Sequence, residues 1–105
     1  MVNDDLREHQ QFAMKIEQAV RMTNREVLHP IVDPLTEDKV LSVAVEVAKR
    51  RAAYIDSTLK MAVAGEHAPS GEELRSLRLK YEEGRDAFAE LMTAIERGHI
   101  DLPAS

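Results

Sequence analysis

Apolar residues recur at intervals of three and four along three long stretches of the chain, and short segments containing proline or glycine separate these stretches. This spacing gathers the apolar side chains on one side of a helix. All four prolines, and every glycine except Gly84, fall between the stretches or at their ends. The pattern predicts helices over residues 4–28, 34–64 and 71–98, followed by a short tail at 99–105.

The middle stretch is the most apolar part of the sequence. Its apolar side chains cover an arc of roughly 200°, about twice the width expected of a helix that packs on one side only. The first side of this arc consists of Val40, Val43, Ala44, Val47, Tyr54, Ile55 and Ala62. A further row, which we call the outer edge, consists of Leu41, Val45, Ala48, Ala52, Leu59 and Val63. A helix of this kind needs partners on at least two sides.

The ends of the middle helix are marked by residues with known capping preferences. Asp33 followed by Pro34 is a typical helix start, because the aspartate caps free amide groups and proline fits the first turn. Thr36 offers a second possible cap, in front of two acidic residues that favour the positive end of the helix dipole. Gly65 suits a left-handed cap at the other end.

The first and third helices each carry a single apolar stripe. The first stripe consists of Leu6, His9, Ala13, Ile16, Val20, Thr23 and Val27. The third helix carries a heptad of Leu74, Leu77, Tyr81, Gly84, Phe88, Leu91 and Ile95. A repeat of 3.5 residues favours coiled-coil-like packing. Ser70 and Glu73 have the spacing of a capping box, Gly98 is expected to end the helix, and Ile100 or Leu102 to fold back.

Short connections make consecutive helices antiparallel neighbours. We therefore expect an all-α fold, namely a single domain over residues 1–105 built as an antiparallel up-down-up bundle of three long helices. Two narrow stripes do not cover the whole arc of the middle helix. We expect its outer edge to pair with the same edge of a second copy, giving a homodimer, or else with another protein.

Composition excludes several classes of function. The formal net charge of −5 disfavours binding to nucleic acid, which requires a basic surface. The chain has no cysteine, so disulfides and thiolate metal sites are excluded. No apolar run approaches the ~20 residues of a membrane span. The first residues lack the basic and apolar segments of a signal peptide, so we expect a cytoplasmic protein.

Two Glu-x-x-His pairs, Glu26 with His29 and Glu96 with His99, lie at the ends of the first and third helices. In an up-down-up bundle these ends share one pole, where carboxylates and imidazoles could bind zinc, iron or manganese. Both histidines also lie at helix C-termini, where a cation meets the negative end of the dipole. We favour this ordinary role and expect neither a bound metal nor a cofactor.

Arg51 falls within the apolar arc of the middle helix. A buried guanidinium needs a carboxylate partner, and Glu17, Glu82 and Asp86 are expected at the same height, next to Gly84. Two interpretations remain open. In the favoured one the methylene groups of Arg51 lie along the core and its guanidinium reaches water. In the other, Arg51 is the centre of an anion-binding pocket.

No remaining residue belongs to a catalytic pattern. His9 lies alone on an apolar stripe, where a partly buried residue with one hydrogen bond is the ordinary interpretation. The serines and threonines match no phosphate loop or nucleophile motif. We therefore expect a non-enzymatic helical protein that acts through protein–protein association, as an adaptor, a chaperone-like protein or a regulatory subunit. The alternative is a helical bundle that binds a metal or a small anion, with or without catalytic activity.

Overall fold

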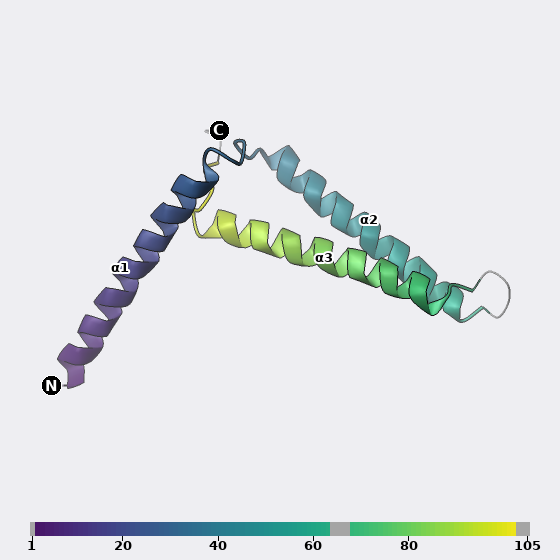
Figure 1. Cartoon of the computed structure of the whole chain (residues 1–105), viewed down its shortest axis with the longest axis horizontal. Coiled ribbons are helices and arrows are strands. Elements are labelled where there is room, and N and C mark those ends of the chain that lie inside the picture. Colours follow the sequence, from purple (N-terminus) through teal and green to yellow (C-terminus); the bar gives the residue numbers. More distant parts are fainter. Residues whose placement is uncertain (1, 64–67, 103–105) are drawn as a thin grey trace. The chain divides into compact units, whose positions relative to one another are not determined.

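A computed structural model describes residues 2–63 and 68–102, and this part of the chain contains three helices and no strand (Figure 1). The helices are α1 (Val2–Leu28), α2 (Glu37–Met61) and α3 (Gly71–Glu96). The prediction of an all-α chain is confirmed. None of the described helices combines the length and apolar character that crossing a membrane requires.

The second of the two possible caps starts α2. The Thr36 hydroxyl accepts a hydrogen bond from the backbone N–H of Lys39 at 3.2 Å, and Thr36 itself has an extended backbone. The helix therefore begins at Glu37 rather than Pro34, and Asp33 belongs to the connection. At the other end Ala62 follows the last helical residue, while the expected end at 64 and the Gly65 cap lie outside the described residues.

The two ends of α3 follow the expected chemistry. The Ser70 hydroxyl accepts a hydrogen bond from the Glu73 N–H at 3.1 Å, which confirms Ser70 as the cap. Gly98 has a φ of +72°, and its N–H donates to the Ile95 carbonyl at 3.1 Å. The His99 N–H donates to the Ala94 carbonyl at 2.8 Å. These two bonds form a Schellman motif, for which glycine is the favoured residue at positive φ.

Contacts divide the chain into two compact units. The first unit consists of Met1–Leu35 together with Thr93–Ser105, and the second consists of Thr36–Met92. The second unit contains α2 and most of α3, which lie side by side (Figure 1). The α3 heptad residues within this unit are all buried or half-buried: Leu74, Leu77, Tyr81, Gly84, Phe88 and Leu91. The least exposed residues of α2 are Val40, Ala44, Val47, Arg50, Tyr54 and Ser57.

The contacts of α2 with α3 run in opposite directions along the two helices. Val47 and Arg50 lie against Gly84, where a Cβ atom would be 3.2 Å from Arg50 Nη1 and 3.5 Å from Val47 Cγ2. Further along α2, the ring of Tyr54 stacks on that of Tyr81 with centroids 6.4 Å apart. Arg50 Nη1 also donates to the backbone carbonyl of Lys80 at 3.1 Å. Side-chain packing and one side-chain-to-backbone bond therefore hold this pair together.

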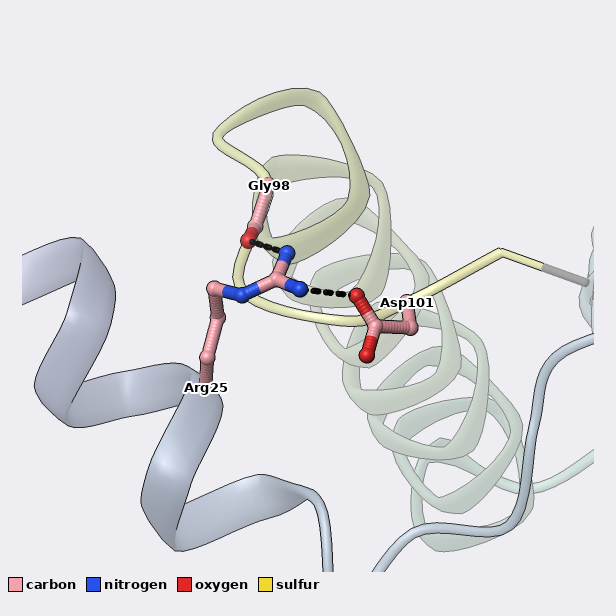
Figure 2. Close-up of polar contacts among 3 residues, drawn as sticks. All are labelled: Arg25, Gly98 and Asp101. Carbon is pink, nitrogen blue, oxygen red and sulfur yellow. Dashed lines mark hydrogen bonds and ion pairs between the residues drawn. The ribbon is translucent and has the colours of Figure 1, made fainter.

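In the first unit, the segment after α3 lies against the end of α1. Arg25 Nη1 donates to the carbonyl of Gly98 at 2.9 Å, and Nη2 pairs with the Asp101 carboxylate (Figure 2). Ile100 is half-buried and lines a small cavity together with Leu28, whereas Leu102 is exposed. Of the two residues expected to fold back, Ile100 does so.

Candidate interaction surface

The outer edge of α2 is exposed along its whole length. The exposed fractions are 59% for Leu41, 45% for Val45 and 68% for Leu59. Val63, which was expected to continue the row, is 65% exposed and lies two residues beyond the end of α2 at Met61. The two small members of the row, Ala48 and Ala52, are exposed as well. Within the second unit, α3 packs against the row of Val40, Ala44, Val47 and Tyr54, and the outer edge takes no part in that contact.

The apolar stripe of α1 is exposed too. Its largest members, which are Leu6, Ile16, Val20 and Val27, all retain about half of their accessible surface or more. Phe12, at the edge of the stripe, is 67% exposed. Exposed stripes of this length on helices are unusual in a soluble monomer, which rarely leaves large contiguous apolar patches in water.

The core of the described residues is correspondingly small. Leu35, at 9% exposure, is the one large apolar side chain that counts as buried there, and no described side chain is fully enclosed. A compact domain of this size usually buries about two thirds of the surface that its unfolded chain exposes. The apolar side chains needed for a larger core are present, but they lie on the surfaces of α1 and α2.

The structure does not bring the four candidate metal ligands together. His29 and His99 line the same small cavity of about 100 Å³ in the first unit. Glu96 lines a separate open hollow that includes His99, and Glu26 lines neither. Within residues 2–63 and 68–102, no three side chains of the ligating types lie close enough to hold a metal ion.

The arginine that lies against Gly84 is Arg50, whereas Arg51 lies outside the contact with α3. Arg51 is exposed and forms no ion pair within the described part of the chain. Its neighbour Arg50 occupies the place beside Gly84 and pairs with Glu46 at 3.5 Å. The row that faces α3 passes through Val47, so Arg50 follows it by the required three residues and Arg51 does not.

Two of the three proposed partners of Arg51, Glu82 and Asp86, form ion pairs within α3. Glu82 lies 3.9 Å from Arg78, and Asp86 lies 3.3 Å from Arg85. The hydrogen bond from Arg85 to Asp86 raises the pKa of the Arg85 guanidinium, which also lies over the ring of Tyr81, 5.6 Å from its centroid. These contacts are exposed and organise the surface of α3 rather than a pocket.

His9 is exposed rather than partly buried. Its Nδ1 forms a hydrogen bond of 2.6 Å with the carbonyl oxygen of Asp5, one turn earlier in α1. The single hydrogen bond that the sequence suggested is therefore present, within the helix. His9 lines neither of the two hollows of the first unit.

No family model, curated protein or solved structure matches this chain. The basis for a functional conclusion is therefore the exposed apolar surface itself.

The contact of Arg25 gives a first testable expectation. We expect Arg25→Met to cost about 1 kcal/mol of unfolding free energy, because it removes a partly exposed ion pair and one hydrogen bond to the Gly98 carbonyl. Backbone NMR relaxation should show greater motion of residues 99–102. Lys15→Met, on the exposed part of α1, is the matched control and should leave that segment unchanged. Equal relaxation in all three proteins would contradict the assigned role.

Proposed function

We propose that this chain is a non-enzymatic helical protein that acts by association, and that its partner is a second copy bound through the outer edge of α2. The observation that carries the proposal is the division of α2 into two apolar rows. One row packs against α3, and the other remains exposed. Another protein that uses the same edge is the fallback, as in an adaptor, a chaperone-like protein or a regulatory subunit.

The energetics support association through this edge. Burying a large aliphatic side chain contributes about 1.5–3 kcal/mol, and three such residues lie in the row within α2: Leu41, Val45 and Leu59. Val63, the fourth, follows the end of the helix. Ala48 and Ala52 lie near its centre and let two backbones approach closely. A two-fold axis places the same residues on both sides of the contact, so one apolar row is sufficient to make the interface self-complementary.

We further propose that α1 completes an up-down-up bundle with α2 and α3. The connection between Leu28 and Thr36 is short, and short connections favour antiparallel neighbours. Closing α1 in this way would cover its stripe of Leu6, Ile16, Val20 and Val27. The outer edge of α2 would then be the main apolar surface left for a partner.

Analytical ultracentrifugation of the purified chain tests the proposal. We expect a species of twice the chain mass of 11.8 kDa that dissociates on dilution. The melting temperature should rise with protein concentration, because association stabilises only the folded form. A folded monomer at every concentration, with a melting temperature independent of concentration, would overturn the homodimer.

A further inference from the structure

The exposed surface of α2 contains a complete heptad seam. Ile55, which is exposed and not part of the outer edge as defined above, fills the gap between Ala52 and Leu59. The resulting seam consists of Leu41, Val45, Ala48, Ala52, Ile55 and Leu59, with alternating steps of four and three residues. This pattern places every member on one line along the helix and is the signature of a coiled-coil contact. A helix of the partner therefore fits this seam better than a sheet or a loop does.

We infer that the second copy lies parallel to the first along this seam, with Arg51 of each chain opposite Asp56 of the partner subunit. The inference rests on the proposed function and adds the orientation of the two copies and the residues that select it. The charged side chains that flank the seam decide the orientation of the two copies, because charged residues at these positions select orientation in coiled coils.

Arg51 and Asp56 flank opposite sides of the seam. In a parallel pair, a residue on one flank meets the residue five positions later on the opposite flank of the partner. Arg51 therefore meets Asp56 of the partner subunit, and the two-fold axis repeats the contact. Arg51 is exposed and forms no ion pair within the described residues. Asp56 uses its Oδ2 to pair with Lys60 at 2.9 Å, which leaves Oδ1 to accept a second cation.

An antiparallel pair places like charges together. Matching the apolar members in that orientation sets the two-fold axis midway between Ala48 and Ala52. Lys49 and Arg51 lie next to this midpoint on either flank, so each would lie beside its own copy in the partner. Two repulsive pairs at the centre oppose this orientation, whereas the parallel one has two attractive pairs and brings Lys49 close to the uncharged Ala44 of the partner subunit.

Neutralising single charges distinguishes the two orientations by the sign of the effect. For a parallel dimer we expect Arg51→Gln and Asp56→Asn each to raise the dissociation constant about three- to tenfold, and Lys49→Gln to leave it unchanged. Combining Arg51→Asp with Asp56→Arg should restore most of the affinity. Tighter dimers for both Arg51→Gln and Lys49→Gln would overturn the parallel arrangement. Sedimentation equilibrium measures all of these constants.

Disulfide trapping gives an independent test, because the chain has no cysteine of its own. In the parallel dimer, Leu41→Cys places the two thiols opposite each other, and mild oxidation should link the chains. In the antiparallel dimer, Leu41 meets Leu59 and its own copy is roughly 27 Å away along the helix axis. Glu46→Cys, outside the seam, is the matched control and should not be linked.

The outcomes separate the two proposals. A disulfide in Leu41→Cys supports the parallel orientation. A disulfide that forms only when the Leu41→Cys and Leu59→Cys chains are mixed would overturn the orientation and leave the dimer intact. A protein that is monomeric before any substitution would overturn the dimer itself.

Discussion

The combined substitution Val45→Glu and Leu59→Glu is expected to give folded monomers. Both side chains are exposed on α2 and face away from α3, so the second unit should keep its α2–α3 contacts. In the dimer each substitution removes roughly 1.5–3 kcal/mol of apolar burial and adds a carboxylate that cannot be buried without a partner. The dissociation constant should therefore rise by at least about a hundredfold. Sedimentation measures the loss of association, and circular dichroism measures the retained helix.

A second variant tests whether the loss of association depends on where the two negative charges are placed or only on their number. Ser76→Glu with Ala87→Glu adds the same two negative charges to exposed positions of α3. This variant should remain a dimer of unchanged affinity. If Val45→Glu with Leu59→Glu is unfolded, the outer edge belongs to the core of the chain itself. If it is folded and as dimeric as the unsubstituted chain, the interface lies on another face.

The parts of the fold that could be predicted from the sequence are those governed by local rules. The heptad of α3 determines which residues face α2, because it forms a narrow apolar stripe that can be buried in only one rotation of the helix about its axis. Ser70 and Gly98 mark the ends of α3 through hydrogen bonds within a few residues. The start of α2 was ambiguous because two cap sequences, at Asp33 and Thr36, adjoin each other. The one whose hydroxyl reaches the Lys39 N–H is the actual cap.

The rotation of α2 could not be predicted in the same way. A residue in a helix is displaced by about 100° from its neighbour, and an apolar arc of roughly 200° accommodates several rotations. The sequence therefore did not determine whether Arg50 or Arg51 faces α3. The spacing along the chain does contain a signal, because Arg50 lies three residues after Val47 and four before Tyr54. Arg50 needs no carboxylate on α3 at this position, since it donates to the backbone carbonyl of Lys80.

Whether the candidate metal ligands meet depends on distances between residues far apart in the sequence, which the local rules for helix ends do not predict. His29 and His99 do line one cavity, as their positions at two helix ends suggested. The glutamates one turn before them lie elsewhere, because an i, i+3 pair at a helix terminus can lose its common face when the chain leaves the helix. His29 and His99 both follow the last helical residue of α1 or α3. Two helix ends can therefore lie near each other without bringing their histidines and glutamates within reach of one metal ion.

Gly84 is the position of the second unit where a substitution should have the largest effect on stability. It is the one buried glycine of the described residues, and the side chains of Arg50 and Val47 lie against it. We expect Gly84→Leu to lower the unfolding free energy by about 1–3 kcal/mol, because its additional carbons require α2 and α3 to separate. A loss of this size is a substantial fraction of the roughly 5–15 kcal/mol that stabilises a typical domain. Urea denaturation followed by circular dichroism measures it.

Gly84→Ala separates crowding from the intrinsic cost of glycine in a helix. Its Cβ would lie 3.2 Å from Nη1 and 3.3 Å from Cδ of Arg50, a flexible side chain that can move by a few tenths of an ångström. Alanine favours the helix by about 1 kcal/mol over glycine, so we expect this variant to be as stable as the unsubstituted chain or slightly more so. Ala87→Leu, at an exposed position of α3, controls for the added volume and should change little. A Gly84→Leu variant as stable as Gly84→Ala would mean that α2 and α3 do not approach closely at this point, and Arg50 would then have no interhelical role.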